Sequence, residues 1–79
     1  MIHQYKLNGY NIVMDTYSGA VHVVDDLAFD IIALYEATPV EEIVTMMLEQ
    51  YANDPEINET EIRDTLSDVE ELKANGELF

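Results

Sequence analysis

The dipeptide Asn8-Gly9, between two apolar stretches, is the feature that most constrains how this chain folds. Both residues accept positive φ, and a two-residue loop of this composition is the strongest short-range signal of a β-hairpin. It therefore predicts an antiparallel pair of strands, His3 to Leu7 and Tyr10 to Asp15. The second strand alternates, with one face made of Tyr10, Ile12 and Met14 and the other of Asn11, Val13 and Asp15.

A third strand is predicted after a turn that ends in Gly19. This strand, Ala20 to Val24, is rich in β-branched residues, lacks proline and precedes only helices, so we expect it to end the sheet. An uncovered edge offers unpaired N–H and C=O groups to another chain. The hypothesis is that a peptide adds here as a further strand. The residues expected to bind it are Ala20, Val21, His22, Val23 and Val24.

Two helices are predicted next. Asp25 or Asp26 should cap the first, which runs roughly from Leu27 to Ala37 with a wide apolar stripe. The segment Thr38-Pro39-Val40-Glu41 has the pattern of a capping box, with proline at the first helical position. It predicts a second helix that runs to about Tyr51.

The third helix is predicted from its cap, Asn58, to about Ala74. If it lies beside the third strand, a groove opens between them, and acids on its rim such as Glu61 and Asp68 favour a basic guest. The residues of this helix expected to contact the peptide are Ile62, Thr65, Leu66, Val69 and Leu72. An apolar stripe at helical spacing usually belongs to the hydrophobic core. For Leu66 and Val69, each considered individually, a place in the core has more support than a role in binding.

The order of elements, three strands and then three helices, indicates an α+β fold with segregated layers. Seventy-nine residues make a single domain, residues 1–79. Two short helices followed by a third amphipathic one, beside a small antiparallel sheet, also fit a winged helix-turn-helix-like outline. The apolar end Leu78-Phe79 is expected either to pack on the core or to mark where a longer protein was cut.

Charge narrows the classes of partner. Three Lys and Arg against 17 Asp and Glu give a net charge of −14, which repels phosphate backbones and disfavours a nucleic-acid partner or a winged-helix DNA binder. The same charge attracts a basic partner, although acids also simply keep a small domain soluble. The sequence shows neither an apolar run near 18 residues nor a signal peptide, so we expect no membrane partner and a cytoplasmic location.

No catalytic constellation is recognisable. The two histidines, His3 and His22, fall on different strands, and no carboxylate lies at ligand spacing beside both. Asp25-Asp26 is explained more simply by helix capping than by a cation. The absence of cysteine excludes thiolate sites within this chain. Ser67 lacks the Asp-Ser-Leu context of an acyl-carrier attachment site. The domain is therefore expected to be non-catalytic, with no metal or cofactor of its own.

The opening HQYKLNGYNIVMDTYSGAVHVVDDLAFDII, above all LNGYNIVMD and SGAVHVVDD, resembles the leader-peptide recognition domain of enzymes that modify ribosomally made peptides. That domain has the fold of the small pyrroloquinoline quinone peptide chaperone. The closer resemblance is to the N-terminal region of radical S-adenosylmethionine maturases that form thioether links in six-cysteines-in-forty-five-residues peptides. It extends over essentially all 79 residues, and the first 35 or so are its specific part.

The resemblance implies a winged helix-turn-helix-like domain with a three-stranded sheet. The leader of a precursor peptide would add to Ala20 to Val24 and pack against Ile62 to Lys73. A catalytic barrel with S-adenosylmethionine and iron–sulfur clusters would follow in cis, so this chain is expected to be an excised domain that binds without reacting. One alternative stays open, a structural or dimerisation domain that pairs the same edge with its own copy.

Overall fold

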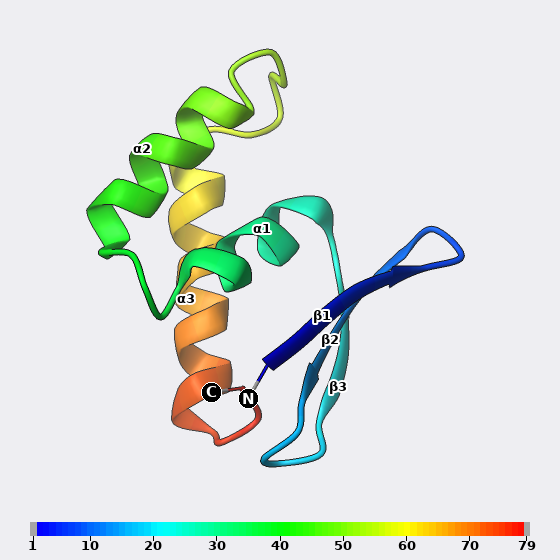
Figure 1. Ribbon diagram of the computed structural model, residues 1–79. Helices are drawn as coiled ribbons and strands as arrows, with labels where there is room; N and C mark the ends of the chain where they lie inside the picture. The colour runs from blue at the N-terminus through cyan, green and yellow to red at the C-terminus, as the bar shows by residue number, and fades with distance from the viewer. Residues whose placement is uncertain (1, 79) are drawn as a thin grey trace.

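The computed structural model describes residues 2–78. The three-stranded antiparallel sheet has the order β1-β2-β3, and three helices follow it, so the expected α+β class is confirmed. Figure 1 shows all three helices on one side of the sheet. The elements are β1 (Ile2–Leu7), β2 (Tyr10–Asp15), β3 (Val21–Val24), α1 (Asp26–Leu34), α2 (Val40–Gln50) and α3 (Glu59–Ala74).

The predicted hairpin joins β1 to β2. Asn8 and Gly9 have φ of 52° and 82°, and Leu7 pairs with Tyr10 across this two-residue turn. On the other side of β2, Val13 pairs with His22 of β3. Because β2 is central, β1 and β3 are both edge strands.

The face of β2 that meets the helices is its more polar one. The exposed fractions of Asn11, Val13 and Asp15 are 8%, 0% and 1%. Both polar side chains have partners, because Asn11 Nδ2 donates to Asp26 Oδ1 at 2.7 Å and Asp15 Oδ1 accepts from the main-chain N of Tyr17 at 2.9 Å. Satisfied hydrogen bonds are what makes the burial of such groups tolerable.

The hydrophobic core lies between this face of the sheet and the helices. Leu78, after α3, belongs to it and is 0% exposed. Leu78 therefore packs on the core, which was one of the two predictions for Leu78-Phe79. Phe79 lies outside the described residues. The other buried apolar residues are Val13, Leu27, Ile31, Ile32, Ile43, Val44, Met47, Ile62, Leu66 and Val69.

Two of the three predicted helix starts are confirmed. Asp25 caps α1 by accepting from the main-chain N of Ala28 at 2.8 Å, and Asn58 caps α3 by accepting from that of Glu61 at 2.9 Å. The first helix, however, ends at Leu34, three residues before the expected end.

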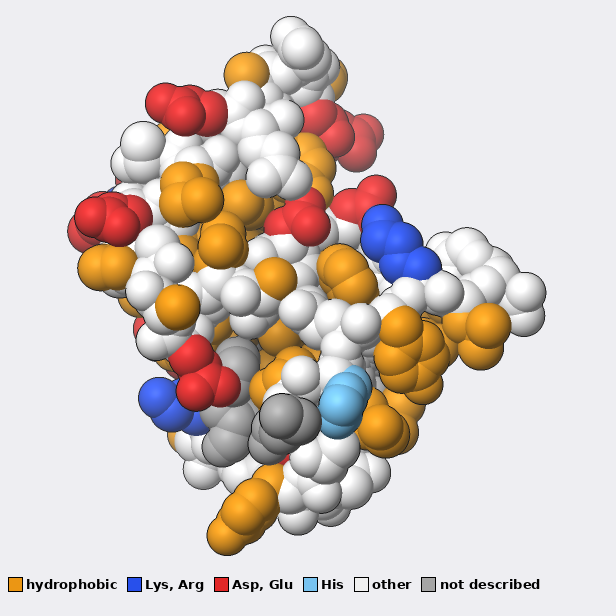
Figure 2. All heavy atoms as spheres, viewed as in Figure 1, with side chains coloured by type: hydrophobic (Ala, Val, Ile, Leu, Met, Phe, Trp, Pro, Cys, Tyr) orange, Lys and Arg blue, Asp and Glu red, His pale blue; other side chains and the backbone are white. Residues whose placement is uncertain are grey.

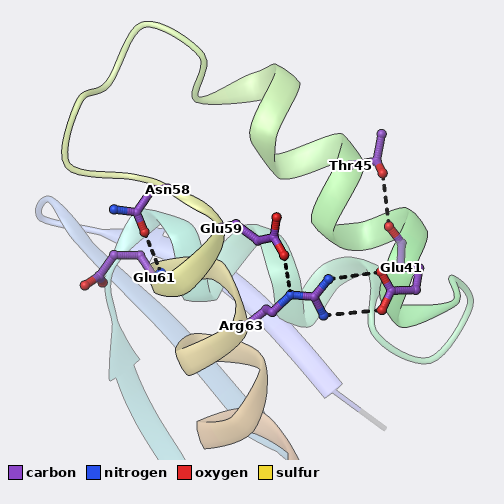
Figure 3. A network of polar contacts seen from close by, with 6 residues as sticks. All are labelled: Glu41, Thr45, Asn58, Glu59, Glu61 and Arg63. Carbon is purple, nitrogen blue, oxygen red and sulfur yellow. Dashed lines mark hydrogen bonds and ion pairs between the residues drawn. The ribbon is translucent and has the colours of Figure 1, made fainter.

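The predicted capping box of α2 is wrong. Pro39 itself occupies the N-cap position, with an extended ψ of 146°, and no side chain caps the helix. Thr38 therefore lies one residue too early to cap it. The Glu41 carboxylate, expected to bond back to Thr38, instead receives two hydrogen bonds from Arg63 of α3 (Figure 3).

Candidate functional site

The free edge of β3 is defined by its pairing with β2. The main-chain N of Asp15 donates to the oxygen of Ala20 at 2.9 Å. In an antiparallel ladder, residues whose main-chain groups face the partner strand alternate with residues whose groups face away. Val21 and Val23 therefore direct their N–H and C=O groups away from β2. No described strand pairs with this edge.

The two edges of the sheet differ in how they are protected. The β1 edge carries Lys6, and a charged side chain is one of the devices that discourage a strand from pairing with another chain. The sequence of β3, Val-His-Val-Val, contains neither lysine nor proline. Of the two edges, β3 is therefore the one better suited to accept an added strand.

A groove begins where β3 ends. Its volume is about 230 Å³, and three elements line it. The floor is largely apolar, and two carboxylates, Asp25 and Asp68, stand on its lining. The lining residues are Val24 of β3; Asp25 at the cap of α1; Ala28 and Ile32 of α1; and Thr65, Asp68, Val69 and Leu72 of α3.

The structure brings together four of the predicted binding residues. Val24 of β3 and Thr65, Val69 and Leu72 of α3 all line the groove. Val69 is 2% exposed, so it forms part of the floor, whereas Thr65 and Leu72 are half-buried. The last residue of β3 and one side of α3 thus line the same groove, and α1 forms its third wall.

Two predicted residues of α3 do not reach the groove. Ile62 is 0% exposed and belongs to the core. Leu66 is 3% exposed and lines a separate hollow of about 170 Å³, together with Val40, Arg63, Ser67 and Glu70. Leu66 follows Thr65 directly, and one residue turns the helix by about 100°, which directs the Leu66 side chain away from the groove and toward this second hollow.

The remaining predicted residues belong to the strand. Val21 and Val23 turn their side chains to the side of the sheet opposite the helices, where they are 59% and 64% exposed, so only their main chain faces a guest strand. Ala20 precedes β3 and is half-buried. The His22 side chain lies on the helix side, with Nε2 3.0 Å from the main-chain oxygen of Glu77.

The contribution of α1 to the groove was missed by the sequence reasoning. Asp25 caps α1, as predicted, and Ile32 belongs to the apolar stripe predicted for this helix, whereas the sequence predicts no role for Ala28. One signal could have found them. Because β3 ends at Val24 and α1 begins at Asp26, with one residue between, the first turns of α1 must lie beside the end of β3.

The basic residues of the chain are engaged elsewhere. Arg63 binds Glu41 at 3.1 and 3.3 Å and Glu59 at 2.8 Å, joining the starts of α2 and α3 (Figure 3), and the first of these contacts lowers the pKa of the Glu41 carboxyl. Within residues 2–78, no basic side chain forms an ion pair with Asp25 or Asp68. The groove therefore presents to a guest two carboxylates that have no cationic side chain as partner.

The cations Lys6 and Lys73 lie over aromatic rings. The Lys6 ammonium is 5.4 Å from the ring centre of Phe29, and that of Lys73 is 5.7 Å from the ring centre of Tyr35. Both distances are within the range of a cation–π contact. Desolvation, together with the nearby carboxylate of Glu70, raises the pKa of the Tyr35 hydroxyl.

Residues 2–78 contain no group of three or more His, Asp or Glu placed to hold a metal ion. In the same part of the chain, no helix combines the length and apolar character needed to cross a membrane. No protein-family model matches the chain, and no curated protein matches its sequence. Function must therefore be inferred from the geometry of β3 and its groove.

Proposed function

We propose that this domain binds an extended peptide, which pairs with β3 as a fourth strand and places a side chain in the groove between α1 and α3. The observation that carries the proposal is an unpaired, uncharged strand edge that ends on an apolar groove. In binding by strand addition, main-chain hydrogen bonds supply affinity and pockets for alternate side chains supply specificity.

The dimensions of the site favour a peptide over a larger organic ligand. Pockets for drug-sized molecules usually measure about 300–1,000 Å³. At about 230 Å³ the groove is smaller, and it is partly open to solvent. A guest strand paired with Val21 and Val23 directs every second side chain toward the helices, on the side where Val24 lies. The volume of the groove suits one large apolar side chain of the guest.

Charge favours a basic guest. Asp25 and Asp68 lie on the groove, and the whole chain carries a net charge of −14. A basic peptide is attracted to such a surface over a distance set by the ionic strength, about 8 Å at physiological salt. Binding of this kind weakens as salt is added.

The guest in this proposal is the leader of a ribosomally synthesised precursor peptide. The domain is non-catalytic and delivers the leader to a radical S-adenosylmethionine thioether-forming maturase in cis, which holds the S-adenosylmethionine and iron–sulfur clusters in the cytoplasm. Two observations support this assignment. Residues 3–32 resemble the recognition domain of such maturases, and the groove is lined by the last residue of β3 together with residues of α1 and α3.

A second candidate function is a structural domain that pairs β3 with β3 of its own copy. The valine-rich free edge favours it, because an exposed edge does not select its partner. The charges disfavour it, since two copies joined there bring Asp25 and Asp68 of each chain toward like charges. Peptide binding therefore has the better support.

Titration of isotope-labelled domain with a synthetic basic leader, followed by amide NMR, tests the proposal. We expect shifts at Val21, Val23 and Ala28 and along the groove side of α3. Asp68→Lys should weaken binding several-fold, because it places a cation beside a cationic guest. Glu70→Lys is the matched control, since it makes the same charge change on the side of α3 that faces the second hollow.

Two outcomes contradict the proposal for that leader. The first is the absence of shifts at millimolar leader. The second is an equal loss of affinity in Asp68→Lys and Glu70→Lys, which indicates attraction by net charge and no specific groove. Shifts confined to β3 that depend on protein concentration alone favour the dimerising domain instead.

A further inference from the structure

The side of the sheet opposite the helices is apolar and uncovered. Side chains of all three strands form it, and among residues 2–78 no helix packs on it (Figure 1). Tyr10 is 61% exposed, Val23 64% and Leu7 53%. Figure 2 shows hydrophobic side chains gathered over the strands. We call this surface the outer face; its residues are His3, Tyr5, Leu7, Tyr10, Ile12, Met14, Val21 and Val23.

The outer face reverses the usual pattern of a two-layer fold. An antiparallel sheet with one solvated side normally turns its polar residues outward. Here β2 buries Asn11 and Asp15 toward the helices and turns Tyr10, Ile12 and Met14 outward. Peptide binding at β3 does not account for this, because it uses the strand edge and the helix side. The outer face therefore indicates a second contact surface.

Charge is divided sharply between the two sides of the molecule. Asp15 is the only acid before Asp25, and it is 1% exposed on the helix side. All the other acids belong to the residues from Asp25 onward, which form the helical layer and its loops. The outer face thus has no negative charge of its own to attract a basic partner or to repel an identical surface.

We propose that a second copy of this chain covers the outer face, sheet against sheet. Five side chains of the face, Tyr5, Leu7, Tyr10, Val21 and Val23, are 43–64% exposed, so a contact here removes a contiguous apolar surface from water in each copy. Eight residues are fewer than the roughly 20–30 per side of a standard stable interface, which suits a concentration-dependent dimer. A two-fold axis brings the same neutral patch of each copy together, with the sheets about 10 Å apart.

This arrangement also keeps the acidic layers apart. With the sheets in contact, the helical layers of the two copies lie on the outside of the dimer. The main-chain edge of β3 and the groove beside α3 stay accessible in each copy, since they lie at the edge and on the helix side. Dimerisation through the outer face is therefore independent of peptide binding and compatible with it.

Sedimentation velocity of the whole chain over a range of concentrations and salt tests the proposal. We expect the mass to rise from 9.0 kDa to twice that value as concentration increases. Added salt should strengthen the dimer, because it screens repulsion between two copies of charge −14 while the contact itself is apolar. A basic peptide should show the opposite salt response.

Substitutions locate the contact. Tyr5→Lys and Tyr10→Lys change exposed outer-face residues of β1 and β2, away from the β3 edge, and should each raise the dimer dissociation constant by roughly tenfold or more. Met46→Lys is the control, because Met46 is 42% exposed on α2. Amide NMR spectra establish that each variant is folded.

The dimer dissociation constants of the three variants distinguish a contact through the outer face from other outcomes. Loss of the dimer in both tyrosine variants, with its retention in Met46→Lys, supports the proposal. A chain that stays monomeric at millimolar concentration in high salt overturns it, and so does a dimer that survives Tyr5→Lys and Tyr10→Lys. In the last case the copies pair through another surface, such as the β3 edge.

Discussion

His22 Nε2 lies 3.0 Å from the main-chain oxygen of Glu77, 55 residues further along the chain. A carbonyl oxygen only accepts hydrogen bonds, so this contact requires a proton on Nε2, which both the Nε2–H tautomer and the charged ring supply. It joins β3 to the segment after α3, and the next residue, Leu78, is fully buried in the core. Together these contacts tie β3 to the segment after α3 and anchor that segment in the core.

We expect His22→Ala to lower the free energy of unfolding by about 1 kcal/mol, the usual net value of one hydrogen bond. Urea denaturation measures the change. His3→Ala is the matched control, because His3 lies exposed on the outer face. Equal effects of the two substitutions would show that the contact with Glu77 contributes nothing.

Val23→Pro tests strand addition directly. It removes an N–H group that points away from β2, and proline is tolerated at such positions of edge strands. The domain should therefore fold, while affinity for the leader falls by roughly tenfold through the lost main-chain bond and the bulk of the ring. Val23→Thr keeps both the N–H and the β-branched shape and should bind as the parent does. Isothermal titration calorimetry compares them, and equal affinities would argue against pairing at β3.

Leu78→Ala should destabilise the fold by about 2–5 kcal/mol, as expected for truncating a fully buried leucine. The loss is large against the total stability of a small domain, about 5–15 kcal/mol. Leu48→Ala, at a leucine that is 39% exposed on α2, should cost much less. The midpoints of urea denaturation of the two variants measure the difference. Similar midpoints would mean that Leu78 does not stabilise the core.

The Arg63–Glu41 pair gives a prediction about pH. Hydrogen bonds and the positive charge of Arg63 lower the pKa of Glu41 below its ordinary value of 4.5. Because the pKa is lower in the folded state, the pair stabilises the fold above pH 4.5, and that contribution disappears as the pH falls through the lowered value. Arg63→Gln should return the Glu41 pKa toward 4.5. Carbon NMR titration of the Glu41 carboxyl measures it, and a midpoint near 4.5 in both proteins would refute the effect.

Local chemistry in the sequence determined the elements and most of their boundaries. Asn8-Gly9 specifies a turn that needs positive φ at both positions, and Asp25 and Asn58 satisfy free N–H groups at helix starts. These are interactions among residues close in sequence, which a single chain displays directly. The capping box predicted for α2 is wrong because Pro39 occupies the N-cap position and Glu41 pairs with Arg63, 22 residues away.

The tertiary structure alone decided how the faces are used. Alternation in β2 separates two sets of residues, yet only packing shows that the set containing Asn11 and Asp15 is buried, through partners in α1 and the following turn. The periodicity of α3 likewise puts Leu66 and Val69 on one apolar stripe. Packing of α3 against both α1 and α2 then assigns Val69 to the groove and Leu66 to the second hollow. Periodicity fixes which residues share a face, whereas the contacts that bury a face come from segments far apart in the chain.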